Sequence, residues 1–282
     1  MRDFILTLSC PDRIGVVAAV SGFLAGQSCN ILESAQFGDR ATGEFFMRVV
    51  FQAPDDASLA GLEAAFAPAA QAFAMACAFH DAAAKTPTLI MVSRHGHCLN
   101  DLMFRWRFGD LPIDLRAVVS NHEDFRGLVE QAGLPFHYLP VAAETKAAQE
   151  RALLEIVAKA GVELVVLARY MQVLSAETCA RLRGRVINIH HSFLPGFKGA
   201  RPYHRAHARG VKLIGATAHY VSEDLDEGPI IEQATERVHH GQSVQDFIAA
   251  GRDVEAIVLS RAVKWHAERR VLLNGAKTVV FS

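Results

Sequence analysis

Three polar side chains in the second half of the chain have types that suit attack on a carbonyl group. Asn188 and His190 lie in INIHHSFLPGF (187–197), after an apolar run, and Asp226 lies in the acidic stretch EDLDEGPI (223–230). An amide and an imidazole can donate hydrogen bonds to a developing oxyanion, and a carboxylate can orient the imidazole or accept a proton from water. A structural interpretation also fits, because polar side chains at strand ends often satisfy backbone groups.

The elements that would position these side chains alternate between strands and helices. Short apolar runs predict strands at residues 88–93, 114–120, 136–141, 163–168 and 185–189, with helix-like segments between them. This alternation predicts an open, mostly parallel, Rossmann-like α/β sheet with helices on both faces. Ligands bind outside the carboxyl ends of the strands in such sheets. Asn188 and His190 fall at one such end, two residues apart and therefore on one face.

Two further features complete the prediction for this part of the chain. The segments LIGATAHYV (213–221) and PIIEQATERV (229–238) predict a late hairpin-like pair, and residues 243–270 predict a long terminal helix.

The first eighty residues follow a different plan. Apolar alternation predicts strands at residues 4–10, 30–38, 44–53 and 74–81, and helical spacing predicts helices at 16–26 and 58–73. The order βαββαβ predicts a ferredoxin-like fold. We therefore expect a domain over 1–81, a linker over 82–87 and a larger domain over 88–282.

Composition excludes several classes of protein. The 282 residues are 51% hydrophobic and 21% charged, with a formal net charge of −1, so no global field favours nucleic acid or an anionic membrane as a partner. No apolar run reaches the roughly 18 residues that a membrane helix needs. The five cysteines are odd in number and form no CxxC pair, which favours reduced thiols and a cytoplasmic protein.

Three sequence blocks carry a resemblance to a known family. NIHHSFLPGF, GATAHYV and DLDEGPIIEQ, in this order, resemble the formyltetrahydrofolate-dependent formyltransferase fold over residues 88–282. The resemblance implies a catalytic triad of Asn188, His190 and Asp226. It also implies that two segments bind the folate, namely Met171, Gln172, Val173 and Leu174 on one side and Ser222, Glu223, Asp224 and Leu225 on the other. Without the other blocks, LARYMQVLS (167–175) would be interpreted as core packing.

The formyl acceptor is indicated by two departures from the transferase pattern. Transferases acting on phosphoribosyl glycinamide carry a glycine- and serine-rich turn for the phosphate, whereas SRHGHCLND (93–101) contains one glycine and two bulky histidines. The pattern His190-His191-Ser192, with PYHRAHARG (202–210), is similar to formyltetrahydrofolate deformylases, the hydrolytic branch of the family. This resemblance implies hydrolysis of 10-formyltetrahydrofolate to formate and tetrahydrofolate, with the folate as substrate and no bound cofactor. Two alternatives stay open: a formyltransferase with an amine acceptor such as glycinamide ribonucleotide, and a non-catalytic amino-acid sensor.

The N-terminal segment resembles a second family. CPDRIGVVAAVSGFLA followed by CNILES is similar to an ACT domain, a small regulatory module, over residues 1–80. The resemblance implies that an amino-acid effector binds near Asp12, Gly15 and Asn30; alternatively, the domain only joins subunits. A homo-oligomer is expected in either case, because a half-covered sheet with open edges invites pairing.

The remaining polar residues allow weaker interpretations. His204, His207 and His219 could bind a metal, but no HExxH motif or cysteine partner supports this, and we expect no metal site. Lys198 and Arg201 could attract the glutamate tail of the folate or could form a solvated loop.

Overall fold

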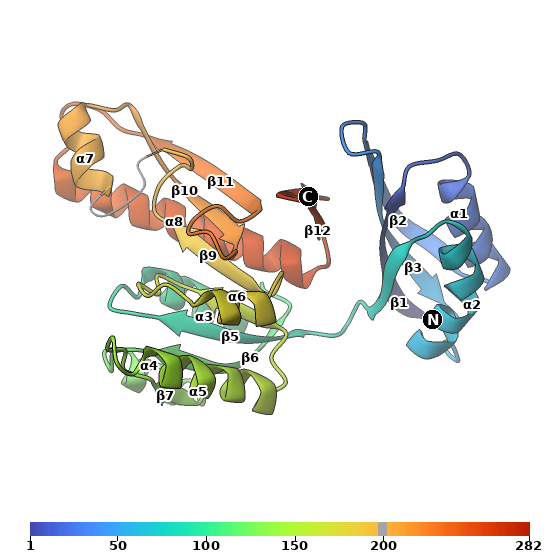
Figure 1. Cartoon of the computed structure of the whole chain (residues 1–282), viewed down its shortest axis with the longest axis horizontal. Coiled ribbons are helices and arrows are strands. Elements are labelled where there is room, and N and C mark those ends of the chain that lie inside the picture. Colours follow the sequence, from blue (N-terminus) through green and yellow to red (C-terminus); the bar gives the residue numbers. More distant parts are fainter. Residues whose placement is uncertain (197–201) are drawn as a thin grey trace. The chain divides into compact units, whose positions relative to one another are not determined.

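The computed structural model describes residues 1–196 and 202–282, which form two compact units (Figure 1). The first unit comprises Met1–Ala84, Glu268–Asn274 and Thr278–Ser282, and the second comprises Lys85–Ala267 and Gly275–Lys277. None of the helices in the described ranges combines the length and the apolarity needed to cross a bilayer.

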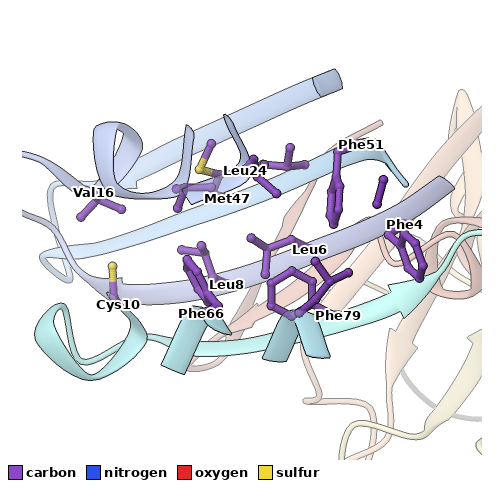
Figure 2. Close-up of a cluster of buried hydrophobic side chains, with 14 of the residues drawn as sticks. Phe4, Leu6, Leu8, Cys10, Val16, Leu24, Met47, Phe51, Phe66 and Phe79 are labelled. Atoms are coloured by element: carbon purple, nitrogen blue, oxygen red, sulfur yellow. The ribbon is translucent and has the colours of Figure 1, made fainter. Parts of the chain in front are cut away.

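The first unit has the predicted ferredoxin-like order. Its elements are β1 (Arg2–Pro11), α1 (Val16–Gly26), β2 (Asn30–Asp39), β3 (Glu44–Ala53), α2 (Leu59–Ala72) and β4 (Ala76–Asp81). The strands form an antiparallel sheet in the order β2-β3-β1-β4. Alternate residues of β1 point to one face, so Phe4, Leu6 and Leu8 all enter the core. Figure 2 shows them beside Leu24 of α1 and Phe66 of α2, which cover this face.

The C-terminus departs from the prediction that residues 88–282 form a single domain. The long helix ends at Ala267, and β12 (Val271–Asn274) and β13 (Lys277–Val280) form a two-stranded sheet. Polar contacts explain why most of this segment packs with the first unit. The side chain of Arg48 is only 3% exposed, and it donates to the carboxylate of Glu33 and to the backbone oxygen of Glu268. Arg270 donates to the same carboxylate of Glu33. Asn274 in turn donates to Asp39.

The second unit contains the predicted mostly parallel sheet. Its strands are β5 (Thr86–Val92), β6 (Ile113–Ser120), β7 (Phe136–Tyr138), β8 (Leu164–Leu167), β9 (Val186–His190), β10 (Leu213–Tyr220) and β11 (Ile230–Arg237). They lie in the order β11-β10-β9-β8-β5-β6-β7. Pairing is parallel from β7 to β9 and antiparallel at β10 and β11, which confirms the predicted late hairpin.

The helices of the second unit cover this sheet. They are α3 (His97–Phe108), α4 (Arg126–Gln131), α5 (Lys146–Lys159), α6 (Ala176–Arg181), α7 (Pro202–Arg209) and α8 (Val244–Ala267). The long helix α8 contacts β9, β10, β11 and α3, whereas Leu153 and Val157 of α5 pack against Leu89 and Met91 of β5. The chain runs from β5 outward to β6 and β7 and then returns to the other side of β5 as β8, so the loops after β5 and β8 diverge. Such a switch point is where open α/β sheets bind ligands.

The polar contacts of the C-terminal segment predict a measurable local effect. Arg270→Ala removes bonds to Glu33, Glu268 and the backbone oxygen of Phe281, so residues 271–281 should open more often. We expect their amide hydrogens to exchange about five to thirty times faster, equivalent to roughly 1–2 kcal/mol of lost charge-assisted bonding. Arg116→Ala, which removes an exposed pair with Asp114 in the second unit, is the control. Unchanged exchange in Arg270→Ala would contradict this account.

Candidate active site

A cavity of about 670 Å³ lies within the second unit, where the carboxyl ends of β5, β8 and β9 meet. Its lining includes all eleven residues that the sequence assigns to catalysis or folate binding: Asn188, His190, Asp226, Met171, Gln172, Val173, Leu174, Ser222, Glu223, Asp224 and Leu225. The structure therefore brings these residues to one site. Their individual roles stay predictions.

His190 and Asp226, both in this lining, form a hydrogen-bonded pair. The Nδ1 atom of His190 lies 3.2 Å from Oδ2 of Asp226, and the two side chains are 6% and 14% exposed. The hydrogen bond from His190 is the largest of the effects that hold the pKa of Asp226 well below its usual range. An ionised carboxylate only accepts, so Nδ1 of His190 carries the proton. Nε2 of His190 is buried and has no hydrogen-bond partner among the described residues, so it is free for a ligand.

Asn188 is held by a histidine on the neighbouring strand. His219 lies opposite Asn188 in the β9–β10 ladder, and Nδ2 of Asn188 lies 3.2 Å from Nε2 of His219. The other ring nitrogen of His219 donates to the backbone oxygen of Tyr220 at 2.9 Å, so Nε2 can accept from the amide. His219 also approaches Asp226, with 3.8 Å between Nε2 and Oδ1. His219, which the sequence analysis considered only as a possible metal ligand, thus orients Asn188.

The turn between β10 and β11 carries Asp226 over β9. The ladder shifts register between Ala218 and His219, a bulge of the kind that re-aims side chains beside functional sites. Asp226 itself adopts φ 59°, a left-handed conformation that aspartate tolerates better than most residues. Gly228 follows, and a Cβ there would lie 1.7 Å from the backbone oxygen of Tyr220. Only glycine therefore permits the tight return that presents Asp226 to His190.

The segment after His190 is fixed by Thr217, which lies opposite His190 in the ladder and is fully buried. Its hydroxyl donates to the backbone oxygen of Ser192 at 2.9 Å and accepts from the backbone N–H of Leu194 at 3.0 Å. Gln233 of β11 also donates to this hydroxyl, at 2.9 Å. These bonds turn the chain away immediately after His190, as the polar residues and Pro195 suggest.

The loop after β8 is clamped at both ends. The backbone N–H of Met171 donates to Ser93 at 3.0 Å, and that of Ser175, the N-cap of α6, donates to the buried carboxylate of Glu150 at 2.9 Å. Within the described part of the chain, no hydrogen bond engages the backbone N–H groups of Gln172, Val173 or Leu174. The loop is thus rigid at its ends and presents free donors beside the cavity.

A buried carboxylate organises another part of the lining. Glu255 of α8, 1% exposed, accepts from Tyr203 at 2.5 Å and from Nε2 of His97 at 2.8 Å, and it pairs with Nε of Arg169 at 3.3 Å. Burial raises the pKa of Glu255, but the bonds from His97 and Tyr203 and the charge of Arg169 outweigh it and lower the net pKa. Gly251 makes room for the Tyr203 ring, since a Cβ there would lie 2.2 Å from it. We call the cavity lining formed by His95, His97, Arg169, His191, Tyr203, Arg252 and Glu255 the basic lobe.

His191, a member of the basic lobe, also contacts His190. Its ring stacks on His190 with 5.0 Å between centroids and lies 6.4 Å from the ring of Tyr203. Burial, followed by the charges of Arg169 and His190, lowers the pKa of His191 to about 4. His191 is therefore a neutral hydrogen-bonding group near pH 7.

The donor atoms of His97, Cys98 and Glu255 lie within 4.8 Å of one another, as a metal site would require. The set suits a metal poorly, because burial raises the pKa of the Cys98 thiol well above its usual value and Glu255 is already paired with Arg169. Of the histidines considered from sequence, His207 instead contacts the backbone oxygen of Gln242 at 3.1 Å. The absence of a bound metal stays a prediction.

Comparisons with known proteins connect this geometry to a family. The family model described as "Formyl transferase" matches residues 87–263, and the model described as "ACT domain" matches residues 4–64. A formyltetrahydrofolate deformylase of Corynebacterium sp. is 52% identical over 98% of this chain and 97% of the relative. The crystal structure of a formyltetrahydrofolate deformylase from Burkholderia mallei is 56% identical, with a TM-score of 0.96 over 100% of both chains.

The chain belongs to the formyltetrahydrofolate deformylase family. A glycinamide ribonucleotide transformylase from Symbiobacterium toebii is also similar, but less so: 31% identity and a TM-score of 0.66, over 70% of this chain and 95% of the other. Membership confirms the resemblance inferred from the sequence blocks and the predicted combination of an ACT-like and a formyltransferase-like fold.

The residues predicted to bind an effector lie in the first unit. Asp12 follows the end of β1, Gly15 directly precedes α1 with φ 99°, and Asn30 is the first residue of β2; all three are exposed. Nothing in the geometry assigns a ligand to them. Lys198 and Arg201 lie outside the described residues.

Sequence reasoning missed His219, Tyr203, Glu255 and Arg169 as parts of the site. His219 lies in the GATAHYV block, and Arg169 lies within LARYMQVLS (167–175), two residues before Met171, so both had a local signal. Glu255 lies on an amphipathic helix where a carboxylate usually faces solvent, so its burial depends on tertiary packing alone.

The lowered pKa of His191 predicts a pH-dependent stability. In an unfolded chain a histidine has a pKa of about 6.5, and the folded value of His191 is about 4. Between these values the unfolded state binds more protons, so acidification favours unfolding. The wild type should lose stability between pH 7 and pH 5, and we expect this loss to be smaller by about 1–2 kcal/mol in His191→Asn. Urea denaturation at both pH values measures the free energy of unfolding, and His240→Asn, which changes an exposed histidine, is the control. An unchanged pH difference in His191→Asn would refute this assignment.

Proposed function

We propose that this protein hydrolyses 10-formyltetrahydrofolate to formate and tetrahydrofolate. The observation that carries the proposal is the pairing of Nδ1 of His190 with Asp226, which leaves Nε2 of His190 buried and unpartnered at a cavity. Membership in the deformylase family supports the same reaction.

The first step is attack of water on the formyl carbon. Nε2 of His190 takes the proton from water as the carbon–oxygen bond forms, and the Asp226 carboxylate stabilises the resulting imidazolium. The sequence left open whether Asp226 itself accepts this proton. The lowered pKa of Asp226 makes its carboxylate a weak base, which favours His190.

The second step is collapse of the tetrahedral intermediate. The Asn188 amide, oriented by His219, donates to the oxyanion while it exists. The imidazolium of His190 then returns its proton to the folate nitrogen, the carbon–nitrogen bond breaks, and tetrahydrofolate and formic acid result; the acid releases its remaining proton to solvent and becomes formate. The steps use side chains of this chain alone, so we propose that no cofactor is bound.

The folate has a suitable place in the same cavity. The free backbone N–H groups of Gln172, Val173 and Leu174 can donate to the pterin ring, and Met171 and Leu174 offer apolar contact. Residues 222–225 would close the opposite side of the ring. The hydrogen bonds to Ser93 and Glu150 hold residues 171–175 in a fixed conformation, which lowers the entropic cost of binding the pterin ring.

Transfer to an amine acceptor is the second candidate, because the similar transformylase shares the fold. The turn after β5 carries His95 and His97 and a single glycine, whereas a transferase would need a glycine- and serine-rich turn for the acceptor's phosphate. This favours hydrolysis, since water needs no phosphate site.

For the first unit we propose binding of a small amino acid near Asp12, Gly15 and Asn30, supported by the match to the ACT family. We also propose a homo-oligomer, because β2 is an edge strand that exposes Ile31 and Phe37. All five cysteines are free, which supports a reducing compartment such as the cytoplasm.

One assay separates the candidate functions. The protein is incubated with 10-formyltetrahydrofolate alone, and formate is measured enzymatically over time. We expect formate release without an added amine. Release that requires glycinamide ribonucleotide would indicate a transferase, and no release under either condition would favour the sensor.

Substitutions of the central pair test the mechanism. His190→Ala removes the base, and Asp226→Asn removes the charge that stabilises its protonated form, so each should lower kcat by about 10²–10⁴-fold. KM should change little, because the proposed folate contacts lie on other residues. Asp253→Asn, an exposed carboxylate on α8, is the matched control, and thermal unfolding checks that the variants fold. Near-normal kcat in His190→Ala would exclude this mechanism.

A further inference from the structure

Arg169 is a buried cation with unused hydrogen-bonding capacity at the cavity. Its side chain is 10% exposed and lines the cavity, yet neither Nε nor Nη1 has a hydrogen-bond partner among the described residues. Its Nε lies 3.3 Å from Glu255, a contact that neutralises charge without forming a directed hydrogen bond. Burying a guanidinium whose N–H groups lack acceptors is energetically costly unless a ligand supplies those acceptors.

The backbone at Arg169 points to the same conclusion. Arg169 has φ 63°, a left-handed conformation that is unfavourable for a long side chain. Non-glycine residues in this region persist where the surrounding structure holds them, and they cluster at ligand sites. Here the backbone oxygen of Arg169 accepts from the N–H of Ser93, which ties the residue to the loop after β5.

The surroundings of Arg169 favour a ligand with one negative charge. The basic lobe contains two guanidinium groups, those of Arg169 and Arg252, and one carboxylate, that of Glu255. Burial lowers the pKa of His95 and His191, so both rings are neutral donors near pH 7 rather than further cations. Glu255 would repel the second charge of a dianion such as phosphate.

We propose that the basic lobe is a binding site for a small monocarboxylate, with the guanidinium of Arg169 as its anchor. A guanidinium presents N–H groups whose spacing matches the two oxygens of a carboxylate. If the proposed hydrolysis is correct, the natural ligand is the formate product, and this identification rests on that function. The rings of His190, His191 and Tyr203 form a continuous row from the reacting centre to this lobe. Formate held there leaves the pterin contacts undisturbed, so tetrahydrofolate can dissociate independently.

The site is tested by direct binding, without turnover. Sodium [¹³C]formate is titrated into folate-free wild-type protein at neutral pH, and binding is followed by ¹³C NMR line broadening. Arg169→Gln should weaken binding roughly tenfold or more, because it removes charge-assisted bonds. Arg116→Gln, which removes the same charge at an exposed position outside the cavity lining, should bind formate like the wild type. Inorganic phosphate, as a competitor, should displace formate only weakly.

Three outcomes would overturn the proposal: no formate binding to the wild type, equal binding to wild type and Arg169→Gln, or tighter binding of phosphate than of formate. If Arg169→Gln does not fold, Arg169→Lys carries the test. Its single ammonium lacks the paired geometry, so weaker formate binding is expected and unchanged affinity would overturn the assignment. If hydrolysis is observed but formate does not bind, only this site is refuted. If formate binds but no hydrolysis is observed, only the identity of the natural ligand is refuted.

Discussion

The proposed active-site chemistry depends on one contact, that between His190 and Asp226. It fixes which ring nitrogen of His190 carries a proton, and it makes the other nitrogen the available base. The two residues are 36 positions apart and come from different elements, a strand end and a turn. The β9–β10 ladder, its bulge and the tight return at Gly228 bring them together.

Around this contact the cavity has two chemically different sides. The loop after β8 offers free backbone N–H groups and apolar side chains, which suit a flat heterocycle. The basic lobe instead surrounds one buried carboxylate with donors and cations. The Asn188 and His190 side chains lie at the end of β9, so in the proposed mechanism one strand end supplies the catalytic groups and the neighbouring loops supply the binding contacts. This division follows from the switch in strand order between β5 and β8.

The sequence predicted those features that are encoded locally. Alternating strands and helices predicted the sheet, and the short blocks around Asn188, His190 and Asp226 predicted the central site, because each block folds largely by its own pattern. Glu255 and Tyr203 could not be found this way, since they are 52 residues apart and their 2.5 Å contact exists only after α7 packs on α8. The C-terminal hairpin did have a signal: Asn274 and Gly275, flanked by β-forming residues, are typical of a tight turn.

The first unit is built from both ends of the polypeptide, because Arg48 and Glu33 near the start bond to residues 268 and 270 near the finish. During synthesis the polar contacts of this small unit are therefore complete only after residues 268–274 have been added, although its apolar core is translated first. Cutting the gene at the apparent linker would yield a module whose buried guanidinium at position 48 has lost its carbonyl partner. Exchanging this unit between relatives would require residues 268–282 to be moved together with residues 1–84.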